Sequence, residues 1–446
     1  MTERNGFVWG AATAAFQIEG ATKADGRGES IWDRFAATEG NVAWGDTGDP
    51  ACEHYWRWQD DLDLMKSLGL EGYRFSIAWP RIQPAGRGPA NQRGLDFYRG
   101  LVEGLLERGI LPLATLYHWD LPQALQDDGG WASRDIVDRF VEYATIMYDA
   151  LGDVVSDWIT HNEPWVTSFL GYAYGTKAPG IRDWPTAVRT THHALLAHGA
   201  AVRAYRERGD GGRIGITLDL TVAQPASPSR EDEAAAARLD GHHNRWFLDP
   251  LFRGSYPADV VELYEQRVGP FDAVQDGDLE VIAEPTDFLG VNFYRPNLVS
   301  AADDGSVLAI REVDPDVEHT AMGWPIVPSA LTELLLRLQR DYGVVPFVIT
   351  ENGAAFDDEL NGAAVVEDDR RVAYLARHIE AVERAREQGA DVRGYYVWSL
   401  LDNFEWEHGY AKRFGIVFVD FPTQRRIPKR SALWYRDLIA AADGGK

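Results

Sequence analysis

The sequence predicts a closed barrel of eight parallel β-strands, each followed by a helix on the outside. Short apolar or β-branched runs alternate with longer amphipathic stretches along all 446 residues. That alternation is typical of strand–helix units around a parallel sheet, and the length fits one barrel with insertions. No linker, low-complexity tract or fixed repeat divides the chain, so we expect a single domain over residues 1–446.

Eight segments have the length and composition of barrel strands. Most are continuous apolar or β-branched runs, as expected for strands that helices cover on both faces. The predicted strands are 7–13, 72–79, 111–117, 158–162, 213–218, 288–294, 347–351 and 393–398.

Six amphipathic segments between these strands are the clearest helices. They cover residues 55–68, 92–108, 133–151, 185–208, 328–342 and 368–388. Three stretches rich in Asp, Gly and Pro are expected to be inserted loops, at 40–50, 223–233 and 301–315.

Polar and aromatic residues recur where the predicted strands end. In barrels of this kind the chemistry takes place at the carboxyl ends of the strands, which meet at one face. We therefore expect these strand-end residues to gather there. They are Gln17, Arg74, His118, Trp119, Asn162, Glu163, Asn292, Tyr294, Glu351 and Trp398.

Two of these residues are glutamates from distant strands. Glu163 lies in the sequence Thr-His-Asn-Glu-Pro, and Glu351 lies in Ile-Thr-Glu-Asn-Gly. Burying a carboxylate at the end of an apolar strand is costly, which indicates a functional role. Hydrolysis of a glycosidic bond requires such a pair: an acid that protonates the leaving oxygen, and a carboxylate across the anomeric carbon.

Arg74 and Tyr294 are suited to contact one of the two carboxylates. A nearby cation and a phenolic hydrogen bond keep a carboxylate ionised, as a nucleophile requires. The other carboxyl group, facing that negative charge, should have a raised pKa and keep its proton near neutral pH.

Composition excludes several classes of partner. The formal net charge of -25 disfavours binding to nucleic acid and to anionic membrane surfaces. Cys52 is the single cysteine, so no intrachain disulfide can form, which fits a reducing compartment. The N-terminal sequence MTERNGFVWG lacks the pattern of a signal peptide, and no apolar run approaches the ~20 residues that span a bilayer. We expect a soluble cytoplasmic protein.

No motif predicts a cofactor or a metal. The phosphate-binding, dinucleotide-binding and zinc-protease patterns are absent. The adjacent histidines at 192–193 and 242–243 would point apart on a helix, so neither pair forms a natural two-ligand face.

Several blocks in order resemble glycoside hydrolase family 1, the β-glucosidases. The opening block FVWGAATAAFQIEG at 7–20 resembles the family's first signature, and 160–164 and 349–353 resemble its acid/base and nucleophile motifs. The block WSLLDNFEW at 398–406 resembles its sugar-binding loop, which continues through residues 409–415. The resemblance covers essentially the whole chain and implies a single catalytic (β/α)8 domain.

This resemblance implies a retaining double displacement on a small-molecule β-glycoside. Glu351 would be the nucleophile and Glu163 the acid/base, with Arg74, Asn292 and Tyr294 supporting them. The carboxyl groups of such a pair lie roughly 5–5.5 Å apart. The implied substrate-binding residues are Gln17, His118, Trp119, Asn162, Trp324, Trp398, Glu405, Trp406 and Phe414. Among these, Trp398 would stack beneath the sugar, and Trp324 would contact the aglycone.

Activities within the same family stay open. Cellobiose, short β-oligosaccharides and aryl or alkyl β-glucosides are the expected substrates, and a β-galactosidase or β-fucosidase differs from a β-glucosidase only in hydrogen bonds at O4 and O6. A 6-phospho-β-glycosidase fits less well, because Glu405 would repel a 6-phosphate. Asp219 stands where relatives often have Asn, which leaves the leaving-group preference open.

Two other classes of protein remain as alternatives. A non-catalytic sugar-binding barrel predicts the loss of one carboxylate, and both are present. A purely structural barrel would leave the strand-end residues unexplained. The sequence does not indicate an oligomeric state.

Overall fold

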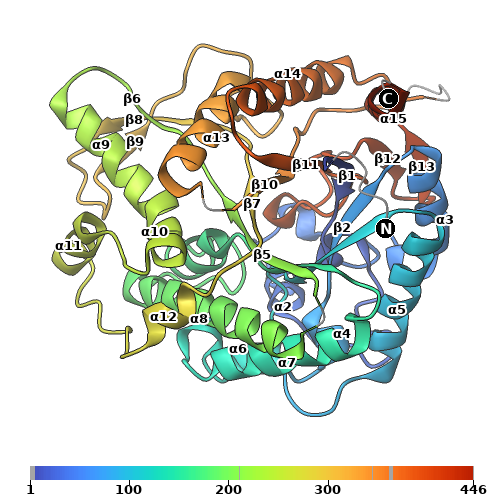
Figure 1. The fold of residues 1–446 in the computed structure, drawn as a ribbon, viewed down its shortest axis with the longest axis horizontal. Helices are drawn as coiled ribbons and strands as arrows, with labels where there is room; N and C mark the ends of the chain where they lie inside the picture. The colour runs from blue at the N-terminus through green and yellow to red at the C-terminus, as the bar shows by residue number, and fades with distance from the viewer. Residues whose placement is uncertain (1–5, 210, 344, 361–364, 445–446) are drawn as a thin grey trace.

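The computed structural model describes residues 6–209, 211–343, 345–360 and 365–444. The N-terminal segment in which we expect no signal peptide begins with Met1 to Asn5, and these five residues lie outside the described ranges. Eight parallel strands close into a barrel in the order β1-β11-β10-β7-β5-β4-β3-β2 (Figure 1). The predicted fold class is therefore confirmed.

The barrel strands match the eight predicted segments. The largest difference is in β2, which ends at Ser76 because Trp79 already begins the short helix α4. The strands are β1 Val8–Ala12, β2 Gly72–Ser76, β3 Leu111–Tyr117, β4 Asp157–Asn162, β5 Arg213–Asp219, β7 Phe288–Asn292, β10 Phe347–Asn352 and β11 Val392–Trp398.

Helices surround the barrel, and the six predicted ones are confirmed. They are α3 His54–Ser67, α5 Gln92–Glu107, α7 Ile136–Leu151, α8 Trp184–Arg208, α13 Pro328–Tyr342 and α14 Asp369–Glu387. Shorter helices fill the connections: α1 Ala15–Ile18, α2 Ile31–Ala37, α4 Trp79–Ile82, α6 Gln123–Asp127, α10 Trp246–Arg253, α11 Ala258–Arg267 and α12 Asp278–Ile282. The C-terminal helix α15 Arg430–Gly444 was not predicted and lies close to the small β12-β13 hairpin (Figure 1).

The prediction that 223–233 and 301–315 are loops is wrong in part. The first segment contains β6 Ala223–Pro225 and the start of α9 Arg230–Asp240, and the second contains β9 Ile310–Glu312. These pieces form a three-stranded sheet with β8 Asn297–Ala301, which lies beside α9 (Figure 1). Strand β6 pairs with β8, more than 70 residues further along the chain, and β9 is a strand of three residues that pairs with the nearby β8. Neither strand has a local pattern that reveals it.

A second small sheet follows the barrel. Strands β12 Val417–Asp420 and β13 Arg425–Pro428 form an antiparallel hairpin that leads directly into α15. The end of the chain is thereby brought back against the barrel, where the Tyr435 hydroxyl donates to the carbonyl oxygens of Gly10 and Tyr395.

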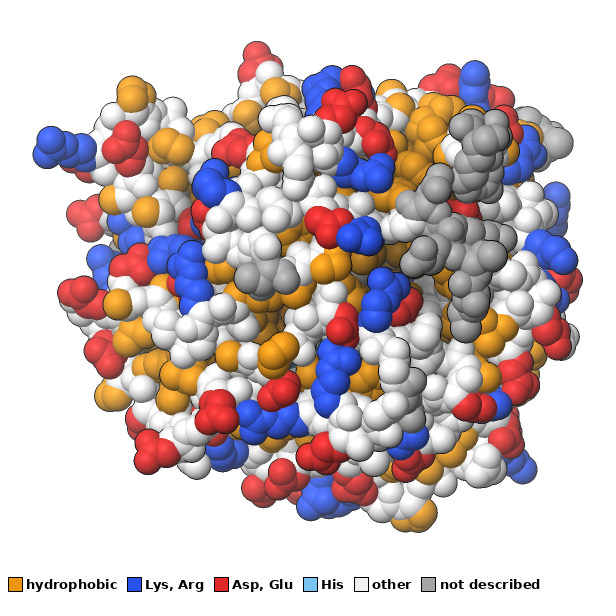
Figure 2. All heavy atoms as spheres, in the orientation of Figure 1, with side chains coloured by type: hydrophobic (Ala, Val, Ile, Leu, Met, Phe, Trp, Pro, Cys, Tyr) orange, Lys and Arg blue, Asp and Glu red, His pale blue; other side chains and the backbone are white. Residues whose placement is uncertain are grey.

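The surface carries many charges and no described membrane-spanning element. Acidic and basic side chains are interspersed over the face seen in Figure 2, although acidic residues predominate in the sequence. Within the described ranges, no helix is both long enough and apolar enough to cross a bilayer.

Glycines allow the first, second and last barrel strands to pack around one aromatic ring. A Cβ at Gly10 would lie 2.4 Å from the Tyr396 ring, and a Cβ at Gly72 would lie 2.6 Å from its hydroxyl. Tyr396 is buried and fills the space that these missing side chains leave.

We expect Gly10→Ala to lower the free energy of unfolding by about 1–3 kcal/mol, because the added methyl group overpacks the barrel. Gly100→Ala is the matched control. Gly100 lies inside α5 with its nearest neighbours at 3.6 Å, so alanine should be neutral or stabilising there. Denaturant titration of both variants measures the difference, and equal stabilities would contradict this account of the barrel.

Candidate active site

Both predicted carboxylates open into one large cavity at the carboxyl ends of the strands. Glu351 belongs to β10, and Glu163 directly follows β4. Their residues are 3% and 5% exposed, respectively. The cavity has a volume of about 1010 Å³, enough for more than one ring of a ligand.

Glu351 is the carboxylate that has a cationic partner. Arg74, at the centre of β2, forms an ion pair with Glu351 Oε1, and the Tyr294 hydroxyl donates to Glu351 Oε2 at 2.6 Å. Arg74 also donates to Asn162 Oδ1 at 2.6 Å, which fixes the orientation of the guanidinium group. These contacts favour the ionised form of Glu351.

Glu163 has a different environment. Asn292 Nδ2 donates to its Oε1 at 2.6 Å, and within the described part of the chain no arginine or lysine forms an ion pair with it. The Glu163 backbone is left-handed, with φ of 50°, a strained conformation that is commonly stored at functional sites.

The two environments separate the protonation states of the carboxyl groups. Burial, together with the negative charges of Asp219 and Glu351, raises the pKa of Glu163 well above its usual value. Burial also raises the pKa of Glu351, but Arg74 and Tyr294 oppose that effect. The first proton to leave this coupled pair therefore comes from Glu351, and Glu163 retains its proton to higher pH.

Amide side chains between the carboxylates are fixed by further hydrogen bonds. Thr350 Oγ1 donates to Asn292 Oδ1 at 2.7 Å, so the Asn292 amide nitrogen must face Glu163. Asn162 Nδ2 lies 3.1 Å from His118 Nε2. Burial and the charge of Arg74 lower the pKa of His118 well below its usual value, so its ring is neutral. With Nε2 accepting from Asn162, the buried Nδ1 of His118 is left as a hydrogen-bond donor.

Aromatic rings cover two sides of the cavity. Near His118, Trp398 and Trp406 have ring centroids 5.8 Å and 6.0 Å from the imidazole, and Trp119 lies 4.5 Å from Trp406. A second group lies beside Glu351, where the Trp324 centroid is 5.3 Å from Tyr294 and 6.0 Å from Phe414. Such flat apolar surfaces suit the C–H faces of a sugar or an aromatic leaving group.

A third carboxyl group lies at the far edge of the site. Burial raises the pKa of Glu405 to about 8, although Lys177 opposes the shift. Lys177 itself forms an ion pair with Glu407. Gln17 Nε2 donates to the carbonyl oxygen of Phe404 at 2.8 Å, and Gln17 Oε1 is buried without a protein partner. Glu405 and Gln17 thus offer hydrogen-bonding groups to a polar ligand.

Gly353 allows the Glu351 strand to approach the Trp398 segment. A Cβ at position 353 would lie 1.7 Å from the Trp398 carbonyl oxygen, which no side chain can occupy. The Asn-Gly that follows Glu351 therefore brings two parts of the site together.

The structure brings most of the predicted residues to the cavity wall. Gln17, Arg74 and Asn162 are not among the lining residues, but they contact three that are: Glu405, Glu351 and His118, respectively. Those that line the cavity are His118, Trp119, Glu163, Asn292, Tyr294, Trp324, Glu351, Trp398, Glu405, Trp406 and Phe414.

Sequence reasoning missed several residues of the same cavity. Lys177, Glu407, His243 and Trp165 line it. Glu407 directly follows the motif ending at Trp406 and could have been found from that position. Lys177 and Trp165 lie in the connection between β4 and α8, where no local pattern marks them.

The chain is similar to known glycosidases over its whole length. A model of the family described as glycosyl hydrolase family 1 matches residues 2–443. The chain is 48% identical over 435 residues to beta-glucosidase A of Acetivibrio thermocellus, with 97% of each covered. It is 45% identical over 456 residues to a bifunctional beta-D-glucosidase/beta-D-fucosidase of Bifidobacterium breve, with 98% of this chain and 97% of that protein covered.

Solved structures agree with this similarity. A family 1 b-glucosidase from Thermotoga maritima has 47% sequence identity and a TM-score of 0.95, with 98% of each chain covered. The AHE enzyme from Alicyclobacillus herbarius has 51% identity and a TM-score of 0.97, covering 100% of this chain and 99% of that one.

We expect Tyr294→Phe to raise the pKa of Glu351. The phenol stabilises the ionised carboxylate by donating to it, so its removal favours the protonated form. NMR titration of glutamate carboxyl carbons measures the change. Tyr374→Phe is the control, because that buried hydroxyl contacts Asn352 rather than a carboxylate. Equal carboxyl titrations in the two variants would contradict the prediction.

Proposed function

The chain belongs to glycosyl hydrolase family 1, and from this premise we propose that it is a retaining exo-β-glucosidase. It releases terminal β-D-glucosyl residues from cellobiose, short β-oligosaccharides and aryl or alkyl β-glucosides. The observation that carries the proposal is the pair of buried carboxyl groups, of which only Glu351 has a cationic partner among the residues that the structure describes. We assign the barrel and its insertions to one catalytic domain.

In the first step Glu351 attacks the anomeric carbon while the bond to the leaving oxygen breaks. Glu163 gives its proton to that oxygen, so the aglycone leaves as a neutral alcohol or phenol and a glycosyl ester forms on Glu351. The raised pKa of Glu163 supports this role, because the acid must be protonated at the start.

In the second step the esterified Glu351 no longer carries a charge. The pKa of Glu163 falls for that reason, and the now ionised Glu163 takes a proton from water as the water attacks the anomeric carbon. Glucose leaves with its β configuration retained, Glu351 returns as a carboxylate with Arg74 beside it, and Glu163 is protonated again.

The terminal sugar is held by groups on the inner side of the cavity. We assign its hydroxyls to Gln17, His118, Asn162, Glu405 and Trp406, and its lower face to Trp398. The donor on His118 Nδ1 and the acceptor on Gln17 Oε1, both buried without protein partners, support this assignment. Trp119 and Phe414 close the sides, and Trp324 faces the aglycone.

The preference for one sugar over another depends on the contacts to its O4 and O6 hydroxyls. A β-galactosidase or β-fucosidase activity is the second candidate, supported by the bifunctional relative from Bifidobacterium breve. A 6-phosphate would bury its charge beside the carboxyl group of Glu405, and the nearby Lys177 is already paired with Glu407, so we expect phosphorylated sugars to be poor substrates.

We place the enzyme in the cytoplasm and expect neither nucleic acid nor membrane among its partners. Cys52 is buried and forms no disulfide, which fits a reducing compartment. The net charge of -25 disfavours nucleic acid and anionic membranes as partners.

The decisive assay compares kcat/KM for the p-nitrophenyl β-D-glucoside, β-D-galactoside and 6-phospho-β-D-glucoside, with Glu351→Gly as the control. We expect the glucoside to be the best substrate and the control to be slower by several orders of magnitude. If the folded protein cleaves none of the three, the proposed activity is wrong. Near-normal turnover in the control would remove Glu351 as the nucleophile.

We expect Glu163→Ala to slow substrates with poor leaving groups most, because they depend on the proton from Glu163. Added azide should partly restore turnover of activated glucosides and yield a β-glycosyl azide, which NMR of the product identifies. An α-azide product would refute the retaining scheme.

We expect Asp219→Asn to move the basic limb of the kcat/KM profile to lower pH. Asp219, paired with His243 at 3.0 Å, adds negative charge near Glu163. Glu351 and Arg74 also act on Glu163 and are unchanged in the variant, so loss of the Asp219 charge lowers the pKa of the acid. Asp304→Asn, at the rim of the same cavity, is the control. A basic limb that stays in place would show that Asp219 does not tune the acid.

A further inference from the structure

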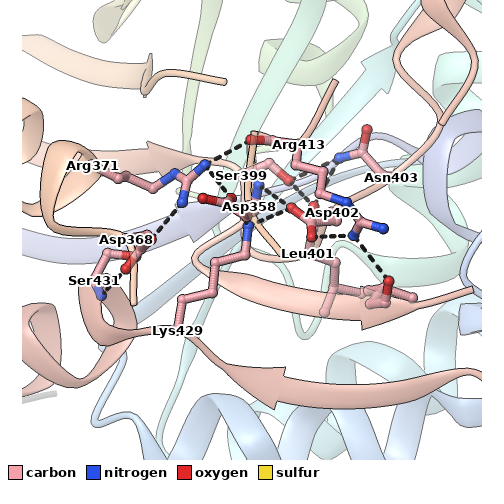
Figure 3. Close-up of polar contacts among 12 residues, drawn as sticks. Asp358, Asp368, Arg371, Ser399, Leu401, Asp402, Asn403, Arg413, Lys429 and Ser431 are labelled. Atoms are coloured by element: carbon pink, nitrogen blue, oxygen red, sulfur yellow. Dashed lines mark hydrogen bonds and ion pairs between the residues drawn. The ribbon is translucent and has the colours of Figure 1, made fainter. Parts of the chain in front are cut away.

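Six charged side chains form a buried ionic cluster that lies outside the active-site cavity (Figure 3). Its carboxylates and cations are equal in number, so the cluster is neutral as a whole. Five of the six side chains are no more than 4% exposed. The members are Asp358, Asp368, Arg371, Asp402, Arg413 and Lys429.

Lys429 joins the two halves of this buried ionic cluster. Its Nζ donates to Asp358 Oδ2 at 2.6 Å and to Asp402 Oδ1 at 2.7 Å. Arg371 also binds Asp358, at 2.7 Å, and Arg413 also binds Asp402, at 2.7 Å. Without Lys429 each aspartate would keep one arginine, and the side-chain link left between the two pairs would be the hydrogen bond from Arg371 Nη2 to the carbonyl oxygen of Arg413 at 2.7 Å. Lys429 is thus the residue that joins the two carboxylates themselves.

One half of the cluster holds the segment that presents the sugar-binding groups. Asp402 lies between Trp398 and Glu405, and its Oδ1 also accepts from the Gly415 backbone nitrogen at 3.0 Å. The next residue, Asn403, donates to Ser399 Oγ at 2.9 Å and accepts from Gln17 Nε2 at 3.1 Å. A shift of Asp402 would therefore be passed to Gln17 and Glu405.

The other half is attached to the segment that directly follows the nucleophile's strand and to the C-terminal helix. Arg371 Nε donates to the carbonyl oxygen of Ala354, three residues after Glu351, at 3.2 Å. Asp368 accepts from Ser431 Oγ at 2.6 Å, and Ser431 belongs to the first turn of α15. The view in Figure 3 shows Lys429 reaching between these two groups of residues.

We propose that Lys429 is a positioning residue for the sugar site. By tying Asp402 to Asp358, it fixes the segment 398–406 relative to Glu351 and thereby sets how strictly the site selects sugars that carry a C6 hydroxymethyl group. The inference rests on the proposed function, which assigns Glu405 to the hydroxyls at this end of the sugar.

The electrostatics of burial decide how the proposal must be tested. Removing Lys429 alone leaves an uncompensated buried negative charge, which destabilises the whole fold and obscures any local effect. The double variant Lys429→Met/Asp358→Asn removes one charge of each sign. It leaves the Arg371–Asp368 and Arg413–Asp402 pairs and the hydrogen bond from Arg371 to the Arg413 carbonyl oxygen intact. It removes the connection through Lys429 together with the Arg371–Asp358 ion pair.

The experiment measures kcat/KM for the p-nitrophenyl glucoside and for the corresponding xyloside, which lacks the C6 hydroxymethyl group. We expect the glucoside-to-xyloside ratio to fall about tenfold in the double variant, because a displacement of about 1 Å at the recognition groups is costly. Backbone amide hydrogen exchange should also accelerate in 399–409. In this segment the backbone N–H groups of Asp402 and Glu405 donate to the carbonyl oxygens of Val417 and Gly409, respectively.

Arg134→Met/Asp278→Asn is the matched control. It removes a partly buried ion pair that joins α12 to the residues before α7 and contacts none of the sugar-binding groups. We expect the control to lower the melting temperature without changing the substrate ratio. Lys429→Gln/Asp358→Asn, which also keeps the cluster neutral but retains polar side chains at both positions, is the milder variant if the methionine variant does not fold. It should change the substrate ratio and the exchange rates in the same direction.

Unchanged exchange in 399–409 would overturn the inference whatever the activity, and so would a substrate ratio that matches the control. Failure of the proposed function would give a different result, because the wild-type protein would then hydrolyse neither glycoside. The comparison of amide exchange between the double variant and the wild type would still decide whether Lys429 positions the segment 398–406.

Discussion

The ion pair between Arg74 and Glu351 is the interaction on which the chemistry of this site depends. Two carboxyl groups are buried in the same cavity, and ionising both would place like charges in a medium of low dielectric constant. A single guanidinium beside Glu351 decides which carboxyl group ionises first. Glu163 is left to hold the proton, with Asp219 and Glu351 adding negative charge around it. The division of roles thus follows from the position of one cation.

The barrel makes this arrangement possible because it delivers the three groups from separate strands. Arg74 comes from β2, Glu163 follows β4 and Glu351 belongs to β10, so their separations are fixed by closed backbone pairing rather than by loops. Close contacts such as that of Gly353 with Trp398 then set the sugar-binding segment against the nucleophile strand. The C-terminal hairpin and helix add a second, electrostatic attachment through Lys429.

The sequence predicts the barrel well because both faces of each strand are covered, which leaves a continuous apolar or β-branched run for most strands. The carboxylates and their strand-end neighbours are also visible, since they interrupt those runs at fixed places. The sheet of β6, β8 and β9 could not be predicted, because β6 pairs with β8 across more than 70 residues of chain and β9 is only three residues long. Two lysines gain their importance only from partners that the fold brings near: Lys177, in the connection after β4, and Lys429, directly after β13.

The most direct test of the central claim is to trap the glycosyl-enzyme. A 2-deoxy-2-fluoro-β-D-glucoside with an activated leaving group slows both steps, but it slows the second step more, so the ester should accumulate. Mass spectrometry of the digested protein should then find one fluoroglucosyl group per chain on the peptide that contains Glu351. A label on the Glu163 peptide, or rapid turnover with inversion and no label, would contradict the assignment of Glu351 as the ionised nucleophile.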